Sequence, residues 1–406
     1  MRGKITEIVS YYCENLDIMD IISNIRHWQL RRQNVENIFI TKLHIKKVRH
    51  LENMEIELSD TERRHLILTG KNGSGKTSLL LALTGSVAKS QLKSQPGSLV
   101  ERINFLTPYH KIPKELAINV SYHGNMKNLV FVYIPARRVE FELPKIMERI
   151  EIDHKTVITR NASKDFLKYI LSLDYQLYGA QRNNNTETEV SLHHWFDNLK
   201  ATLRNIFDAP HLELRSDTKN FSFIIEIPGR EPFALHEMSD GYAAFLDIYM
   251  ELIMRFETDG TVVDYNKSAI VLIDEVEAHL HVELQKRILP FLTQMFPNVQ
   301  FIVSTHSPFV ISSSSNAVVY DLENKRYLEN PSAYSYETIV EAYLDVGQYS
   351  EEMKNTFNKY RELYDKELTG AEAVEFQQLV SALKLVPPAS KELYLAFRTM
   401  EDKRQK

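Results

Sequence analysis

A glycine-rich segment between an apolar run and a helical pattern holds the residues best suited to chemistry. Gly70, Gly75, Lys76 and Thr77 complete the pattern Gly-x-x-x-x-Gly-Lys-Ser/Thr within the sequence LILTGKNGSGKTSLLLAL. Glycines let successive backbone N–H groups point inward, and a helix N-terminus adds a positive dipole end, so the segment predicts a phosphate-binding loop. Lys76 would reach the β- and γ-phosphates of a nucleotide, and the Thr77 hydroxyl would bind Mg²⁺. The residues expected to hold a nucleoside triphosphate are Gly70, Lys71, Asn72, Gly73, Ser74, Gly75, Lys76, Thr77 and Ser78.

Two further apolar runs end in residues that could act on a phosphate. In IVLIDEVEAHLH the run leads into Asp274, suited to hold Mg²⁺ through water, and Glu275, suited to orient or deprotonate the attacking water. In FIVSTHSP the run leads into His306, which would hydrogen-bond the γ-phosphate or that water. A solvated strand end or a structural histidine is the alternative for each taken alone. Their combination with the phosphate loop favours catalysis by Glu275, His306 and Lys76.

A third segment, MSDGY, opens a helix. Ser239 and the backbone of Gly241 at a helix N-terminus could form a second anion site. Serine is also a preferred helix cap, so a purely structural role stays open.

The elements that must position these residues follow from hydrophobic periodicity. Continuous apolar strands such as AIVLI and FIVST, each joined to a helix, predict a parallel sheet covered on both faces. Charged, alternating strands at 37–45 and 54–58 predict a hairpin and an accessory antiparallel sheet. Helices are expected over 1–37, over 140–207 with a polar loop at 181–189, over 240–255 and 282–295, and beyond 333.

Composition places the chain among ordinary globular proteins. It has 406 residues and a formal net charge of −5, which argues against wholesale coating of nucleic acid. Cys13 is the only cysteine, which excludes an intramolecular disulfide and a thiolate metal cluster. No apolar run is long enough to span a bilayer, and the N-terminus does not fit a secretory signal. We therefore expect a cytoplasmic protein without a membrane partner.

Together these segments resemble the motifs of the ABC-type ATPases of the SMC/RecF/OLD group. GKNGSGKT matches the Walker A loop, MSDGY the signature motif, LIDE the Walker B strand, EAHLH the D-loop and STHSP the switch histidine. The wording is most similar to OLD-like, single-chain ATPases of virulence or anti-phage defence, of the Septu or PARIS kind. The resemblance implies an α/β fold: an ABC-type ATPase head with a parallel core sheet, an accessory antiparallel sheet, an inserted helical subdomain and C-terminal helices. The expected parts are an N-terminal helical extension (1–37), lobe I with Walker A (38–139), the helical subdomain (140–210), lobe II (211–332) and a C-terminal helical module (333–406).

The same resemblance implies ATP and Mg²⁺ as cofactors and a head-to-tail homodimer. Ser239 and Gly241 of one chain would contact the γ-phosphate of ATP held by Lys76 and Thr77 of the other. Arg49, in KVRHL, stands where residues of the group approach the adenine or its phosphates, although an exposed strand end explains it equally well. The resemblance further implies a sensor subunit that controls a separately encoded effector.

Other functions remain open at this point. A DNA-clamping repair ATPase is one, because residues 26–50 carry seven Lys and Arg against one Glu; a solvated face and pocket lining is the favoured explanation of that stretch. An ATP-bound scaffold with little turnover is another. The group's usual aspartate at the end of the D-loop is His281 here, which leaves the cross-dimer contact of that loop open. The C-terminal helices fit either a docking module or a lid.

Overall fold

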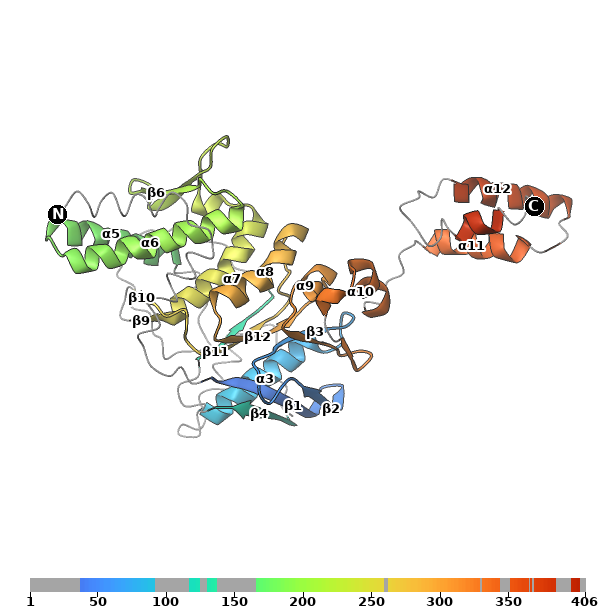
Figure 1. The fold of residues 1–406 in the computed structure, drawn as a ribbon, viewed down its shortest axis with the longest axis horizontal. Coiled ribbons are helices and arrows are strands. Elements are labelled where there is room, and N and C mark those ends of the chain that lie inside the picture. The colour runs from blue at the N-terminus through green and yellow to red at the C-terminus, as the bar shows by residue number, and fades with distance from the viewer. Residues whose placement is uncertain are drawn as a thin grey trace. The chain divides into compact units, whose positions relative to one another are not determined.

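The computed structural model describes residues 37–91, 117–124, 130–136, 166–258, 262–328, 331–343, 351–364, 366, 369–384 and 396–401. The chain divides into two compact units, Met1–Ile339 and Val340–Lys406, which are treated separately below (Figure 1). Residues 1–36 of the helix expected over 1–37, with Cys13 among them, lie outside the described residues. Among the helices of the described part, none is long and apolar enough to cross a membrane.

A six-stranded sheet forms the centre of the first unit, in the order β14-β13-β3-β12-β11-β5. Its strands are β3 (His65–Thr69), β5 (Val130–Ile134), β11 (Ala269–Ile273), β12 (Val299–Ser304), β13 (Ala317–Asp321) and β14 (Arg326–Leu328). All pairs are parallel except β13 with the edge strand β14, which was not foreseen from the sequence. Every residue of β3, β11 and β12 is buried, as continuous apolar strands require. The predicted parallel core sheet is confirmed.

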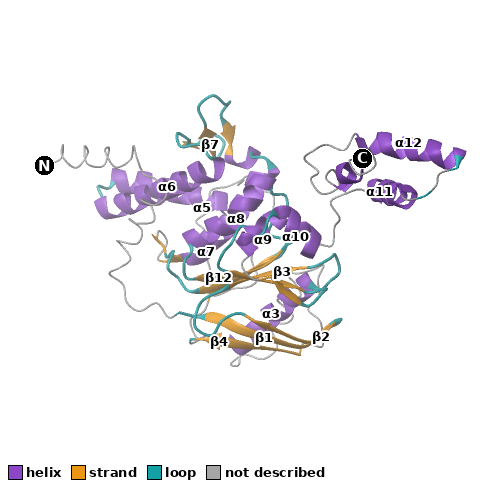
Figure 2. Cartoon of the chain, turned by 45° about the vertical axis from the view of Figure 1, so that its right-hand side comes forward, coloured by secondary structure: helices purple, strands orange, loops and turns teal. Residues whose placement is uncertain are grey.

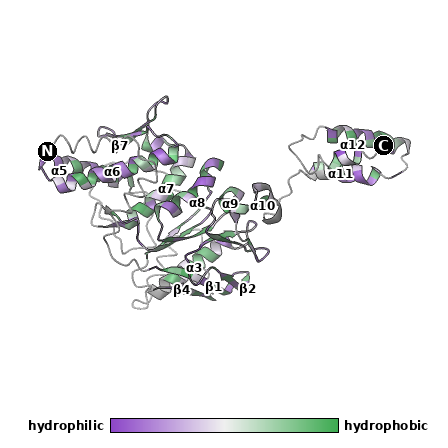
Figure 3. Cartoon of the chain, in the orientation of Figure 1, coloured by the Kyte–Doolittle hydropathy of each residue, from purple (hydrophilic) through white to green (hydrophobic). Residues whose placement is uncertain are grey.

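An antiparallel sheet and one helix cover one face of this sheet. The strands β1 (Phe39–Val48), β2 (Leu51–Glu57) and β4 (Ala117–His123) form the order β2-β1-β4, and the helix is α3 (Lys76–Gln91). Figure 2 shows α3 between the two sheets, and its run Leu79–Leu83 is fully buried. A helix enclosed on two sides needs no separate polar face, and Figure 3 shows the hydrophobic colour over much of α3. The predicted hairpin and accessory sheet are confirmed.

Helices cover the opposite face of the central sheet (Figure 2). They are α7 (Asp240–Phe256), α8 (Val282–Met295) and the short α9 (Pro308–Ser312). Most of α7 is buried, and the rings of Phe245 and Tyr249 pack edge-on against Phe291 of α8.

A helical hairpin extends from this layer, made of α5 (Phe166–Arg182) and α6 (Thr186–Phe207). The polar loop expected at 181–189 is therefore wrong in extent, since only residues 183–185 connect the helices. Asn185 caps α6 by accepting the Thr188 N–H at 3.3 Å, so the acidic residues that follow belong to the first helical turn. A small sheet of β6 (Glu213–Asp217), β7 (Ser222–Glu226) and β8 (Phe233–Ala234), then the turn η3 (Leu235–Glu237), lead into α7. The two-residue strands β9 (Glu257–Thr258) and β10 (Val262–Val263) follow it.

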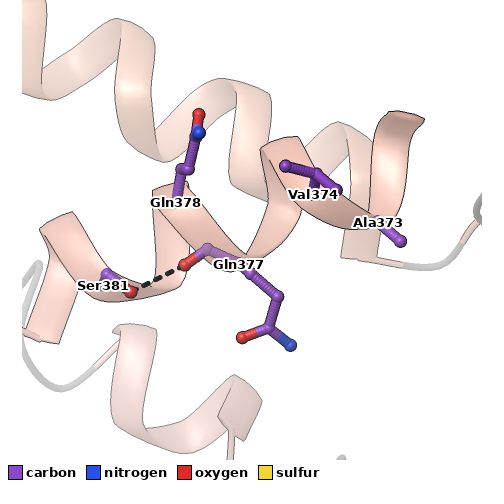
Figure 4. Close-up of a pocket in the computed structure, with 5 residues that line it drawn as sticks. All are labelled: Ala373, Val374, Gln377, Gln378 and Ser381. Atoms are coloured by element: carbon purple, nitrogen blue, oxygen red, sulfur yellow. Dashed lines mark hydrogen bonds between the residues drawn. The ribbon is translucent and has the colours of Figure 1, made fainter. Parts of the chain in front are cut away.

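The second unit is helical in its described residues. The turn η4 (Pro331–Ala333) lies before this unit, and the helix α10 (Tyr336–Tyr343) crosses the boundary at Val340. The helices α11 (Glu351–Tyr364) and α12 (Gly370–Lys384) form the body of the unit. Its core gathers around Tyr360, which is fully buried and stacks on Phe376 at 5.2 Å between ring centroids. A shallow open groove follows one face of α12, lined by Ala373, Val374, Gln377, Gln378 and Ser381 (Figure 4). None of these side chains is charged, and the Ser381 hydroxyl donates a hydrogen bond to the Gln377 carbonyl of its own helix at 2.8 Å.

A buried acid lies where α7 meets the helical hairpin. Glu257 is 3% exposed, and its Oε2 atom has no hydrogen-bond partner among the described residues. Burial raises the pKa of Glu257 to about 7, which the neighbouring Tyr169 hydroxyl of α5 partly opposes. An acid whose pKa is higher in the folded state than in the unfolded chain destabilises the fold once it ionises.

Replacing Glu257 by glutamine should therefore stabilise the first unit in a pH-dependent way. The wild type should lose stability relative to Glu257→Gln as pH rises from about 4.5 towards about 7, the range between the ordinary and the raised pKa. The full difference should be on the order of 3 kcal/mol above that range and near zero below it. Thermal unfolding at several pH values measures this, with exposed Glu283→Gln as the control. A difference that does not change with pH would contradict the assignment.

Candidate functional site: a phosphate loop at the edge of the central sheet

The glycine-rich loop connects β3 to α3 and folds as a curled turn. Gly70, Gly73 and Gly75 have φ angles of +130°, +85° and +100°, which non-glycine residues rarely adopt. Lys76 is 6% exposed and points back into this turn, donating from Nζ to the carbonyl oxygens of Gly70 at 2.7 Å and Lys71 at 3.1 Å. Its charged end thus lies inside the loop where the sequence predicted a phosphate.

The turn of the β1–β2 hairpin lies against the loop. Arg49 occupies this turn with φ +54° and is exposed. A Cβ atom at Gly75 would lie 3.0 Å from Leu51 Cδ1 and 3.2 Å from His50 Cε1, so these side chains leave room only for glycine. The structure therefore places Arg49 next to the residues that touch the phosphate loop.

The carboxylates predicted at the end of β11 take different positions. Asp274 is buried and accepts a hydrogen bond from the Ser304 hydroxyl at 2.6 Å. Ser304 Oγ in turn accepts the backbone N–H of Glu275 at 2.7 Å. The Glu275 side chain is exposed, on a backbone with φ +44°. The hydroxyl of Ser304 thus fixes both residues from the neighbouring strand β12.

The acids around Lys76 balance its charge. Burial lowers the pKa of Lys76, while Glu275, Asp274, Glu277 and Asp321 each act to raise it. Asp321, at the end of β13, is 1% exposed and its Oδ1 lies 3.1 Å from where a Cβ of Gly70 would stand. Because a buried cation without anions is costly, these carboxylates help Lys76 to stay charged.

His306 follows β12 and joins the same site. Burial lowers the pKa of His306, and the positive charge of Lys76 lowers it further while Asp274 opposes both. Its Nε2 atom is buried without a hydrogen-bond partner among the described residues. A neutral imidazole with a free ring nitrogen can bind a phosphate oxygen or a water.

Ser239 and Gly241 lie at the start of α7, with different surroundings. Ser239 is exposed and makes no side-chain bond to its own helix. Gly241 is buried against the loop after β11: a Cβ there would lie 3.0 Å from His281 Cδ2 and 3.3 Å from the His279 carbonyl oxygen. Among the described residues, no hydrogen bond or ion pair joins Ser239 or Gly241 to the phosphate loop.

The donor set fits a nucleoside triphosphate with Mg²⁺. Thr69 Oγ1 and Ser74 Oγ are buried hydroxyls without partners in the described part of the chain, and both belong to the loop or its strand. Backbone N–H groups, Lys76 and hydroxyls suit phosphate oxygens, and Thr77 and Asp274 carry the hard oxygen atoms that Mg²⁺ would prefer as ligands.

Three residues of the site were missed from sequence: Ser304, Glu277 and Asp321. Ser304 and Glu277 belong to the recognised motifs, so their positions beside Glu275 and His306 could have flagged them. Asp321 had only its place at the end of an apolar strand as a signal. Two lysines of the basic stretch 26–50 form ion pairs with acids of the facing strand. Lys42 pairs with Glu57 and Glu55 at 2.9 and 3.0 Å, and Lys47 pairs with Glu52 at 2.8 Å.

A curled glycine loop before a helix, two acids and a histidine at one edge of a parallel sheet define a P-loop domain of the ABC-type ATPase class. The family AAA_21, described as "AAA domain, putative AbiEii toxin, Type IV TA system", matches residues 66–312. The chain belongs to this family.

Curated proteins with similar sequences include Septu and retron proteins, in agreement with the resemblance drawn from the motifs. Septu protein PtuA of Bacillus mycoides (strain KBAB4) is 24% identical over 324 residues, 74% of this chain and 42% of that protein. "Retron Vc95 probable ATPase" of Vibrio cholerae serotype O1 biovar El Tor is 27% identical over 201 residues, 48% of this chain and 38% of that protein. The chain thus spans less than half the length of these curated relatives. A solved structure of the SmcHead bound to the C-winged helix domain of ScpA covers 73% of this chain and 100% of its own, with 15% identity and a TM-score of 0.40.

The crowding at Gly75 predicts a sharp difference between glycine substitutions. Gly75→Ala should abolish nucleotide binding, because it adds both a strained φ and contacts of 3.0–3.2 Å with Leu51 and His50. Gly179→Ala in α5 has open space and no positive φ, so binding should stay at the wild-type level. Fluorescence titration with a labelled ATP analogue compares the two, alongside thermal unfolding. Equal affinity in both variants would contradict the described loop.

Proposed function

We propose that this protein binds and hydrolyses ATP with Mg²⁺ and dimerises head-to-tail around the nucleotide. In this proposal it is the switch subunit of a prokaryotic anti-phage defence system and controls a separate effector. The observation that carries the proposal is the division of the motifs into two groups. Lys76, Asp274, Glu275 and His306 gather around one loop, whereas Ser239 is exposed and has no described bond to that loop.

Within one chain, each residue has a defined task. The loop N–H groups and Lys76 bind the phosphates; Lys76 leaves the carbonyl oxygens of Gly70 and Lys71 to do so. Thr77 and Asp274 would hold the Mg²⁺, which would supply positive charge to stabilise the phosphate oxygens. Glu275, exposed at the end of β11, takes a proton from the attacking water or orients it. His306, neutral because burial lowers its pKa, binds the water or the γ-phosphate through Nε2.

The second chain would complete the site through the start of α7. Ser239 supplies a hydroxyl and Gly241 a backbone N–H at a helix N-terminus, where an anion is favoured. The contact of Gly241 with His279 and His281 ties this second group to the loop after Walker B. Binding of nucleotide near the Walker B strand would thereby affect the position of Ser239 and Gly241 at the start of α7. Arg49 remains a candidate for contact with the nucleotide, supported by the position of its turn beside Gly75.

The defence role rests on the relatives. Their names tie them to Septu and retron systems, and similarity to the Septu protein extends over 74% of this chain. Control of a separate effector is carried over from the resemblance that the sequence motifs show to ATPases of defence systems.

Oligomeric mass with and without ATP tests the dimer directly. ATP should convert the wild type to dimers, Glu275→Gln should trap them because hydrolysis is blocked, and Lys76→Ala should abolish them. Light scattering after gel filtration measures the mass, and exposed Glu283→Gln serves as a control that behaves as wild type. A mass that is identical in all variants and unaffected by ATP would contradict the switch and favour a scaffold.

Mixing two inactive variants tests whether the site is shared between chains. Lys76→Ala and Ser239→Arg should each hydrolyse almost no ATP, because each destroys both composite sites of its homodimer. Random mixing should restore about a quarter of wild-type activity, because half of the dimers then carry one intact composite site. No recovery, in a mixture shown to exchange subunits, would mean that Ser239 does not act across the dimer.

A further inference from the structure

Glu277 differs from the other acids of the loop after β11. Its neighbours Glu275 and His279 are exposed, yet its carboxylate turns inward, where Oε1 accepts the backbone N–H of His306 at 2.5 Å. Its Oε2 atom is buried without a hydrogen-bond partner among the described residues. Burial raises the pKa of Glu277, and the bond from His306 partly opposes this. Placing a carboxylate there is costly, so the bond calls for a functional reason.

The bond joins the two segments that carry the catalytic side chains. Bonds through Ser304 already tie the start of each segment: its hydroxyl meets Asp274 and the Glu275 N–H, and its carbonyl accepts the Val276 N–H at 3.1 Å. On the β12 side these contacts involve Ser304 and do not extend to His306. The bond that Glu277 accepts comes from His306 itself, the residue whose Nε2 atom is buried without a hydrogen-bond partner in the described part of the chain.

The backbone around Glu277 is held in an unusual shape. Glu275 has φ +44° and His279 has φ +66°, both in the left-handed region that costs energy for residues other than glycine. Two tight turns follow, with Ala278 N–H donating to the Glu275 carbonyl at 2.8 Å and Leu280 N–H donating to the Glu277 carbonyl at 2.9 Å. Such a loop keeps its shape only when outside contacts hold it, and the Glu277 side chain supplies one.

We propose that Glu277 is a positioning residue for hydrolysis: its carboxylate fixes the backbone of His306, and so keeps the imidazole aligned with Glu275. The inference rests on the proposed ATP hydrolysis. It assigns Glu277 no contact with the nucleotide, since the carboxylate acts through an accepted hydrogen bond. Glutamine keeps an acceptor oxygen of the same shape and should preserve this role, whereas alanine should not.

Kinetics separate this role from a general loss of structure. Glu277→Ala should lower kcat for ATP on the order of 10-fold with KM within about 2-fold of wild type, because only alignment in the transition state is lost. Glu277→Gln should stay within about 3-fold of wild-type kcat. His306→Ala and the double variant Glu277→Ala/His306→Ala should have the same kcat, since Glu277 acts through His306. Thermal unfolding and exposed Glu283→Ala control for folding.

Three results would overturn the inference: wild-type kcat in Glu277→Ala, equal damage from glutamine and alanine, or multiplied losses in the double variant. Hydrogen exchange gives a readout that does not need turnover. In Glu277→Ala the amide of His306 should exchange at least about 10-fold faster, with β12 unchanged, because its acceptor is gone. A wild type without ATPase activity would count against the proposed function. Hydrogen exchange would still show whether Glu277 fixes the backbone of His306. An unchanged exchange rate in Glu277→Ala would reject that role.

Discussion

The site depends on keeping a positive charge inside the phosphate loop. Lys76 is almost fully buried, and burial alone favours its neutral form. Four carboxylates from the ends of β11 and β13 and the loop after β11 oppose that tendency. Only a parallel sheet brings these acids together, since the carboxyl ends of its strands meet at one edge. The charge of Lys76 therefore depends on the order of the strands in the central sheet.

Hydrogen bonds between β11 and β12 convert this arrangement into a defined geometry. Ser304 fixes Asp274 and Glu275 through a single hydroxyl, and Glu277 reaches across to the backbone of His306. All three bonds join residues that are 29 or 30 positions apart in sequence. The acid proposed to contact water, Glu275, and the histidine proposed to contact phosphate, His306, are therefore tied to each other through hydrogen bonds.

The helical layer links this unit to the start of α7. Tyr242 stacks on Phe207 at 4.1 Å between centroids, at the end of α6, and the Thr202 hydroxyl meets the Tyr249 hydroxyl at 3.0 Å inside the same interface. The helical hairpin therefore packs against α7, the helix that begins after Ser239. In a head-to-tail dimer, any partner that shifts this hairpin would reposition Ser239 relative to the nucleotide of the other chain. This contact would give the proposed switch a physical basis.

The sequence by itself determined the elements whose chemistry is local. A glycine loop must curl, a continuous apolar strand must be buried, and alternating charges mark a half-exposed hairpin, so the phosphate loop, β11, β12 and the β1–β2 hairpin were predicted correctly. The extent of the helical hairpin was not, because the capping bond of Asn185 moves the start of α6 into a stretch that is polar in composition.

Only the tertiary structure decided how distant segments meet. Two strands that follow each other in sequence, β4 and β5, join different sheets. Glu275 faces outward while Glu277 turns in, although both stand in the same short acidic motif. Lys42 and Lys47 are neutralised by acids of the facing strand. Such outcomes depend on pairing between residues far apart in the chain, which periodicity and residue type within a window do not encode.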